Sequence, residues 1–209
     1  MSIILYLCGI IIMSYLFFLG QIIIHNCVHG SAFRTRARNR IVGQVIASLQ
    51  LANYEGWRVA HLLHHRYTND KRDPYRIEMP AVPYIVSQYF RHVREFWDGR
   101  KYIAAIAPPI GFACLVILWH AQIGQCSRGL LWVGCFWLLP TMVSHMLVAH
   151  FNYITHVGLP QGRGEDTRSF DWGVWRVINK LTLNFYLHRE HHLSPSEAIP
   201  TPNPLVTAR

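Results

Sequence analysis

The sequence has little charge and few acidic residues. Only 15% of its 209 residues are charged, whereas an ordinary soluble domain has about 25%. The 11 acidic residues are outnumbered by 20 Lys and Arg, which gives a net charge of +9. This composition argues against a soluble globular protein and favours a chain that lies largely in a membrane. No nucleic-acid-binding motif accompanies the basic excess, so we expect no nucleic-acid partner.

The sequence also lacks any pair of cysteines with the CxxC spacing. The five cysteines are odd in number, and four of them lie in or beside apolar stretches. This pattern argues against a disulfide framework. We expect five free thiols, because an unpaired cysteine packs as a small apolar side chain.

Three long segments contain no charged residue: 3–24, 103–126 and 129–149. Each is long enough, at about 1.5 Å per residue, to cross a bilayer core of about 30 Å. The first segment lacks the basic start and the cleavage site of a signal peptide, so we expect it to be a membrane span. The short link at 121–128 predicts an antiparallel hairpin. We therefore predict an all-α integral membrane protein with about three transmembrane helices, forming a single domain over residues 1–209.

Three shorter apolar segments, 41–53, 81–90 and 171–187, predict interfacial or re-entrant helices. The proline-rich tail after Pro195 predicts irregular structure.

The distribution of basic residues predicts the orientation of the chain. Residues 30–101 hold thirteen Lys and Arg, residues 121–128 hold one, and residues 150–209 hold six. Basic segments stay in the cytoplasm, so 30–101 and the C-terminal segment are expected there. The protein is then a multi-pass membrane protein.

Histidine is abundant, and nine of the 13 histidines fall into four clusters that this topology places on one membrane face. The clusters read HNCVH, HLLHH, NYITH and HREHH. Helical spacing of three and four residues lets each cluster aim its imidazoles at one point. Neutral imidazole is the commonest metal-ligand side chain, and nine ligands suit two ions. We predict these catalytic and metal-binding histidines, with Asn152 as a further metal-site residue: His25, His29, His61, His64, His65, His156, His188, His191 and His192.

Each of the other polar residues near the clusters has more than one possible role. His145 shares a helical face with His156 and could line a cavity or hydrogen-bond a neighbouring helix. Four carboxylates could accept hydrogen bonds from ligand imidazoles, although Asp70 and Asp73 could equally lie at the surface: Glu55, Asp70, Asp73 and Glu190.

At these residues the sequence resembles the integral-membrane fatty acid desaturase/hydroxylase superfamily, whose signature is three histidine boxes. Here the boxes read HNCVH, HLLHH and HREHH, and the flanks HGSAF, HHRYTNDKRDP and HHLSP agree as well. The segment NYITHVGL resembles the additional Asn/His element before the last box and is most similar to alkane-hydroxylase-like members. The resemblance covers about residues 20–200.

The resemblance implies a di-iron centre on the nine histidines, with Asn152 reaching one ion through a water. It also implies a lipid or hydrocarbon substrate, O2, and electrons from a separate carrier such as ferredoxin, rubredoxin or cytochrome b5. Our leading expectation is an acyl-lipid desaturase whose active site faces the cytoplasm. Members commonly begin with a pair of transmembrane helices, and here we expect only one of that pair, so the N-terminal hairpin is expected to be shortened.

Three alternatives remain open. The same boxes occur in hydroxylases and ketolases of alkanes, sterols or carotenoids. A histidine-rich metal transporter would need ligands near the bilayer midplane. A haem-b protein would need paired histidines inside neighbouring spans. Iron content and a haem absorbance scan distinguish these alternatives.

Overall fold

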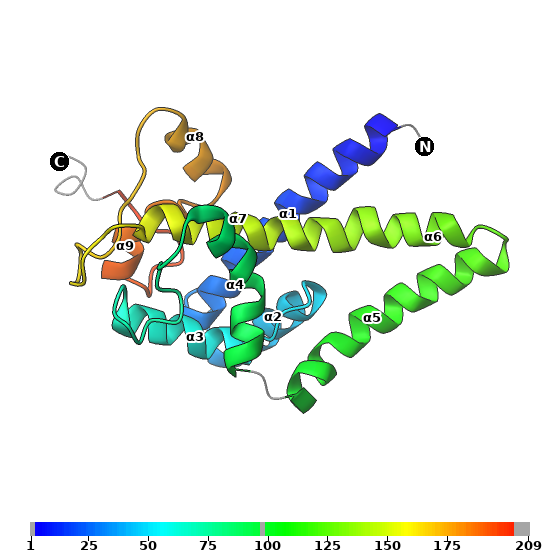
Figure 1. The fold of residues 1–209 in the computed structure, drawn as a ribbon, viewed down its shortest axis with the longest axis horizontal. Helices are drawn as coiled ribbons and strands as arrows, with labels where there is room; N and C mark the ends of the chain where they lie inside the picture. The colour runs from blue at the N-terminus through cyan, green and yellow to red at the C-terminus, as the bar shows by residue number, and fades with distance from the viewer. Residues whose placement is uncertain (1–2, 97–98, 203–209) are drawn as a thin grey trace.

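The computed structural model describes the backbone of residues 3–96 and 99–202, and their side chains except those of 89–102. Within these residues the chain is helical and contains no strand (Figure 1), which confirms the predicted all-α class. The helices are, in order, α1 (Ile3–His29), α2 (Arg36–Leu49), α3 (Tyr54–Tyr67), α4 (Ala81–Phe96), α5 (Gly99–Gln122), α6 (Cys126–Val133), the π-helical turn η1 (Gly134–Leu138), α7 (Leu139–His156), α8 (Val174–Leu181) and α9 (His188–Leu193).

Three helical segments are long and apolar enough to cross a membrane, as predicted: Ile3–His29, Ile103–Gln122 and Cys126–His156. The first and third run past the predicted ends at residues 24 and 149. Backbone hydrogen bonding continues a helix whether or not its side chains are apolar, so both spans carry histidines in their last turns. The predicted link at 121–128 is shorter, since α5 ends at Gln122 and α6 begins at Cys126. Gly124, with φ at 69°, permits this tight turn.

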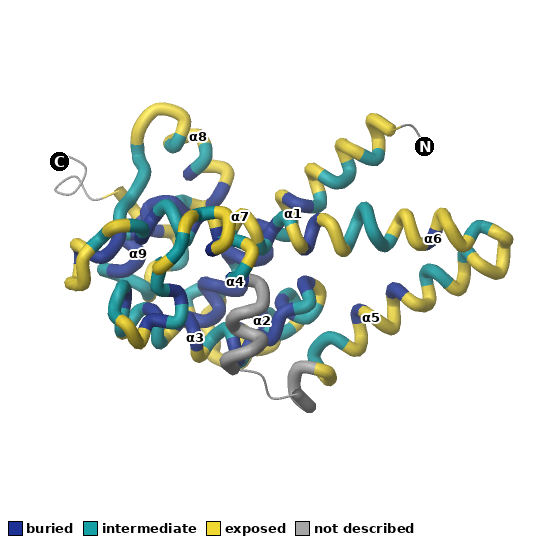
Figure 2. The backbone as a smooth tube through the Cα atoms, viewed as in Figure 1, coloured by how far each residue is buried: buried dark blue, intermediate teal, exposed yellow. Residues whose placement is uncertain are grey.

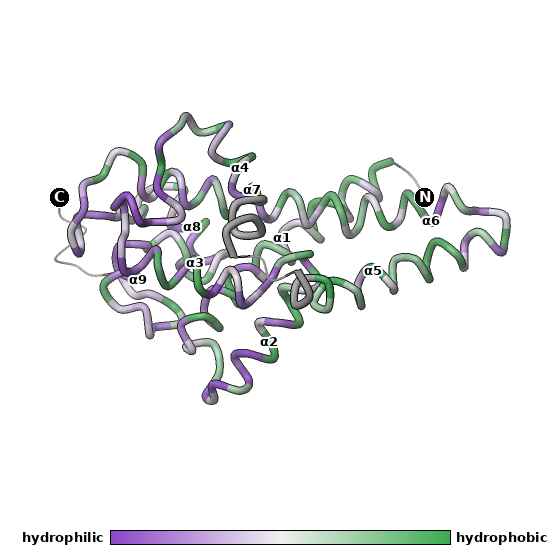
Figure 3. The backbone as a smooth tube through the Cα atoms, turned by 60° about the horizontal axis from the view of Figure 1, so that its bottom comes forward, coloured by the Kyte–Doolittle hydropathy of each residue, from purple (hydrophilic) through white to green (hydrophobic). Residues whose placement is uncertain are grey.

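The helices divide into a polar end and an apolar end. Helices α2, α3, α4 and α9 gather around the C-terminal parts of α1 and α7, where most buried residues lie (Figure 2). The α5–α6 hairpin and the first half of α1 reach away from this bundle and are strongly hydrophobic (Figure 3). Large apolar side chains on these helices are exposed, including Ile11, Leu115 and Trp119. An exposed apolar surface of this kind is what contact with lipid requires.

Two buried clusters hold the end of α1 in place. One packs α1 against α2 and the start of α3, and its buried residues are Ile24, Cys27, Val28, Ala47, Ala52 and Tyr54. The other packs α1 against α7 and the segment before α9, and its buried residues are Phe18, Ile22, Phe151, Phe185 and Tyr186. A Cβ on Gly43 would lie 2.3 Å from Cε2 of Tyr54, so only glycine lets α2 approach this ring. The histidines at the end of α1 therefore project from a fixed position.

The three shorter apolar segments fall in α2, α4 and α8, but with different ends: α2 begins earlier and ends earlier than predicted, α4 runs past residue 90, and α8 covers less than predicted. It spans Val174–Leu181, whereas the prediction ran from 171 to 187. Leu183 and Asn184 have φ angles of 53° and 59°, in the left-handed region that ends a right-handed helix. Beyond Pro195 the described residues, up to 202, are irregular as predicted. All five cysteines are free, which confirms that prediction.

Candidate metal centre

The nine predicted histidines meet at one end of the three spans. Helix α1 contributes two from its last two turns, α3 contributes three, α7 contributes its final residue, and α9 contributes three. These helices are far apart in the sequence, and the two buried clusters bring them together. The predicted convergence on one face of the spans is therefore confirmed.

Five of these histidines form one group, called here the five-histidine group: His25, His29, His61, His65 and His191. One ring nitrogen from each lies within 4.8 Å of the others. The Nε2 atom of His61 lies 2.9 Å from Nε2 of His29 and 3.1 Å from Nε2 of His65. Nε2 of His65 lies 3.2 Å from Nε2 of His191. Three members are buried, while His29 and His65 are partly exposed.

The other four form the four-histidine group: His64, His156, His188 and His192. All four are buried, and their ring nitrogens also lie within 4.8 Å of one another. Nε2 of His156 lies 2.9 Å from Nε2 of His188. The Nε2 atoms of His64 and His192 are buried and have no hydrogen-bond partner among the described residues.

Each three-histidine box divides between the two groups, contrary to the expectation that one cluster aims at one point. In HLLHH the first and last histidines, His61 and His65, belong to the five-histidine group, and His64 belongs to the four-histidine group. HREHH divides in the same way, with its outer pair in the four-histidine group. Residues four apart differ by about 40° around a helix, whereas a residue three along lies about 60° to the other side. One helix can therefore supply ligands to two neighbouring points.

The spacing of the nitrogens fits a bound metal ion in each group. A metal–imidazole bond is about 2.0–2.1 Å long, so two imidazole nitrogens at right angles around an ion lie about 3 Å apart. The Nε2 separations of 2.9–3.2 Å agree with this value. Buried nitrogens without a partner are rare in proteins, and a bound ion would satisfy the Nε2 atoms of His25, His64 and His192.

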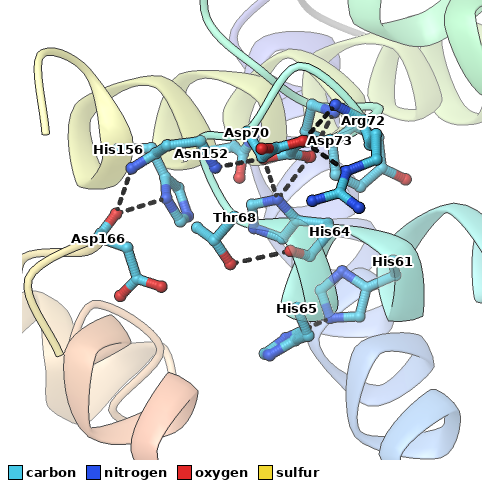
Figure 4. A network of polar contacts seen from close by, with 12 residues as sticks. His61, His64, His65, Thr68, Asp70, Arg72, Asp73, Asn152, His156 and Asp166 are labelled. Atoms are coloured by element: carbon cyan, nitrogen blue, oxygen red, sulfur yellow. Dashed lines mark hydrogen bonds and ion pairs between the residues drawn. The ribbon is translucent and has the colours of Figure 1, made fainter. Parts of the chain in front are cut away.

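Hydrogen bonds at Nδ1 orient two histidines of the four-histidine group (Figure 4). Nδ1 of His64 lies 2.9 Å from both carboxylate oxygens of Asp73, and Nδ1 of His156 lies 3.1 Å from the backbone oxygen of Asp166. Carboxylates and carbonyls only accept, so both Nδ1 atoms carry a proton, and Nε2 is the atom of each ring that is left to bind a metal ion. Such partners fix the ring and raise its basicity as a ligand.

Of the four carboxylates considered from the sequence, Asp73 is the one that holds a ligand histidine. It also accepts from the backbone N–H groups of Asn69 and Tyr75, which closes the turn after α3. It therefore has both of the predicted roles, as a turn residue and as a histidine partner. The other three interact with side chains outside the two groups: Glu55 with Arg40 and Arg58, Asp70 with Arg72, and Glu190 with Ser169.

Five of the histidines outside the spans have a lowered pKa: His61, His65, His188, His191 and His192. Burial, followed by the neighbouring histidines, lowers the pKa of His61, His188 and His192 well below the usual value of about 6.5. The pKa values of His65 and His191 are lowered for the same reasons. Neutral imidazole is the form that binds a metal ion, so these side chains are ready to act as ligands at neutral pH.

Both groups face one small cavity of about 70 Å³. His25 and His61 of the five-histidine group line it, and so does His188 of the four-histidine group. Much of the remaining wall is apolar, including Phe151 and Phe185. A small guest in this cavity would therefore contact both groups at once.

Asn152 and His145 lie on α7 and also line this cavity. The amide nitrogen of Asn152 donates to the hydroxyl of Tyr84, and the role of Asn152 at a metal stays a prediction. His145 Nε2 lies 2.9 Å from the backbone oxygen of Gln50. Its Nδ1 lies 3.2 Å from Nε2 of Gln21. Both readings of His145 are thus realised, since it lines the cavity and hydrogen-bonds neighbouring helices.

The sequence analysis missed Trp57 and Tyr84. Trp57 stacks on His61 with ring centroids 4.9 Å apart and an interplanar angle of 12°. Its position four residues before His61, on the same helical face, could have indicated this contact. Tyr84 reaches Asn152 from α4, and no local pattern links these two residues.

A second cavity, of about 1070 Å³, lies among α1, α2, α5 and the α6–η1 segment. Its lining is mostly apolar, with Phe17, Phe112 and Phe136 among the walls and the Arg40–Glu55 ion pair at one edge. It shares no lining residue with the small cavity, because α2 lies between them.

Comparison with known proteins agrees with this geometry. A family model described as "Fatty acid desaturase" matches residues 2–203. The sn-1 oleoyl-lipid 12-desaturase of a Synechocystis strain is 26% identical over 225 residues, which cover 86% of this chain and 60% of the relative. A probable fatty acid desaturase of Sorghum bicolor is 26% identical over 82% of the chain and 54% of the relative. The chloroplastic omega-6 fatty acid desaturase of Spinacia oleracea is 24% identical, over 82% and 46%.

The chain therefore spans about half to three fifths of the length of these relatives. The family model, in contrast, matches nearly all of the chain, and the matched range contains all nine histidines. Together these findings establish that the chain belongs to the fatty acid desaturase family.

Proposed function

We propose that the protein is a membrane-embedded, O2-dependent desaturase of acyl lipids. The observation that carries this proposal is that two groups of histidines, in a chain of this family, face the same small cavity at one end of three apolar spans. Each group would hold one iron ion. Bound there, the irons would supply O2 activation: two hydrogens from neighbouring substrate carbons, two electrons from a separate carrier and two protons would together reduce O2 to two waters.

Other residues of the chain would orient the histidine rings and exclude water from the cavity. The Nδ1–H groups of His64 and His156 donate to the Asp73 carboxylate and the Asp166 carbonyl, respectively. Their Nε2 atoms are therefore the ones that would bind an ion. Phe151 and Phe185 exclude water from the cavity wall. An apolar wall next to the ligands suits a methylene chain better than a polar substrate.

Several observations favour this function over the alternatives. The relatives named above are all called desaturases, which favours desaturation over hydroxylation. The histidines gather at one end of the spans, whereas a transporter would place its ligands near the midplane. The basic residues of 30–101 support a cytoplasmic position for this end, where a soluble carrier of the ferredoxin, rubredoxin or cytochrome b5 type could reach it.

Lipid analysis tests the proposal. Cells expressing the chain are grown with and without oxygen, beside cells expressing His64→Ala and the control His120→Ala. His120 lies at the far end of α5 and belongs to neither group, so its loss should leave activity intact. We expect a new double bond in acyl lipids that requires both oxygen and His64. A new hydroxyl group in the lipids would instead identify the protein as a hydroxylase. Purified protein that contains no iron would contradict the proposal.

A further inference from the structure

Tyr84 is a buried residue of α4 whose hydroxyl lies between two partners. Its side chain is fully buried, with 0% of its surface exposed. The hydroxyl donates to the backbone oxygen of Tyr75 over 3.0 Å, and it accepts from the side-chain amide of Asn152 on α7. It thus joins the segment after α3, helix α4 and helix α7 at the edge of the small cavity.

These two hydrogen bonds decide which way the amide of Asn152 points. A tyrosine hydroxyl has one proton, and here the Tyr75 carbonyl takes it, because a carbonyl can only accept. The hydroxyl oxygen can then only accept from its second partner. Asn152 must therefore present its nitrogen, Nδ2, to Tyr84, and its oxygen, Oδ1, is turned away from this hydroxyl.

Oδ1 of Asn152 has no hydrogen-bond partner within the part of the chain that the structure describes. Asn152 lies four residues before His156, one helical turn along α7 (Figure 4), and shares the cavity wall with His188. Both histidines belong to the four-histidine group, which has one ligand fewer than the five-histidine group. An oxygen held at this place could complete the smaller group, directly or through a water.

We propose that Tyr84 is a positioning residue that fixes the amide of Asn152 so that its oxygen serves the metal ion of the four-histidine group. This inference rests on the proposed function, because it assumes that both groups bind iron. Tyr84 does not touch the ion and acts only through Asn152. Losing the Tyr84 hydroxyl or the Asn152 amide should therefore have the same effect, and losing both should add nothing.

Iron titration of the metal-free protein, followed without turnover, tests this role. The proteins are the wild type, Tyr84→Phe, Asn152→Ala and the double variant. Partners that orient a metal site typically contribute about 10–100-fold in affinity. We expect each single variant to bind one of the two irons at least about 10-fold more weakly and the double variant to match the single ones, since coupled residues are not additive.

Tyr186→Phe is the matched control. Tyr186 is also a buried tyrosine, in the cluster between α1 and α7, but its hydroxyl makes no hydrogen bond among the described residues. Its loss should leave both iron affinities unchanged.

The outcomes separate this role from the proposed function. Wild-type protein that binds no iron would defeat both. Wild type that binds two irons, with Tyr84→Phe or Asn152→Ala binding both equally tightly, would overturn the positioning role alone. Additive losses in the double variant would overturn it as well. If Tyr84→Phe fails to fold, normal iron binding by Asn152→Ala still overturns the role, because Tyr84 is proposed to act only through Asn152.

Discussion

The two histidine groups are neighbours, yet the protein surrounds them differently. The four-histidine group is buried throughout, and two of its members have their Nδ1 atoms bound by the Asp73 carboxylate and the Asp166 carbonyl. The five-histidine group has more ligands, but His29 and His65 are partly exposed. Its one partner of this kind among the described residues is the amide oxygen of Asn26, 3.3 Å from Nδ1 of His25.

This difference matters for the proposed metal binding, because the two groups would hold an ion by different means. The four-histidine group has no spare ligand and relies on fixed partners. The five-histidine group can lose one ligand and still hold four, and it is closer to solvent. We therefore expect the buried group to be the more sensitive to substitution and the partly exposed group to be the faster to exchange its metal.

The largest effect should come from removing a ligand of the smaller group. His192→Ala leaves three histidines there, whereas His29→Ala leaves four in the other group. We expect His192→Ala to retain about one iron per chain and to lose activity by more than about 100-fold, because a ligand contributes more than the partners that orient it. His29→Ala should retain both irons with weaker binding.

Iron per chain, measured on purified protein, checks this prediction. The comparison between the groups fails if His29→Ala loses an iron and His192→Ala does not.

A smaller effect should follow from removing the partner of a ligand. Asp73→Asn replaces the carboxylate that fixes His64, and we expect iron affinity at one position to fall by about 10–100-fold. Asp70→Asn is the control, since Asp70 lies three residues away and pairs with exposed Arg72. It should change affinity by less than about 3-fold, in line with the small value of surface ion pairs. Equal losses of iron affinity in the two variants would show that iron binding depends on the turn after α3 and not on the hydrogen bond from His64 to Asp73.

The smallest expected effect is on the rate at which a chelator removes iron. A strong chelator should remove iron from the wild type in two phases, because His29 and His65 open one group to solvent while the other is buried. The His192→Ala variant, which keeps only the iron of the five-histidine group, should show the fast phase alone. Absorbance of the iron–chelator complex follows both reactions. A single phase in the wild type would mean that the difference in burial does not control metal release.

Much of the fold could be predicted because hydropathy is a local property. The uncharged runs at 3–24, 103–126 and 129–149 located all three spans. The ends were less accurate, since α1 and α7 continue through polar residues to His29 and His156. The end of α8 also differs from the prediction, because the left-handed residues Leu183 and Asn184 turn the chain back on the helix, where the backbone N–H of Asn184 donates to the Asn179 carbonyl.

The sequence predicted which histidines come together, but not how they divide into two groups. The nine histidines and their shared face came from spacing and topology, and the structure brings them together. Their division into five and four was missed, although helical geometry alone separates His64 from His61 and His65. Which of four carboxylates would hold a histidine could not be predicted, because the turn after α3 brings Asp73 back to His64 and turns Asp70 toward Arg72.

The sequence by itself determined three apolar spans, a basic segment between the first and second, and four histidine clusters, since each follows from the order of side chains along the chain. Only the tertiary structure decided which histidines share a group, which of them are buried and which cavity they face. It also decided that Tyr84, from α4, meets Asn152, from α7. These features depend on contacts between helices far apart in the chain, and such contacts leave no periodic pattern in the sequence.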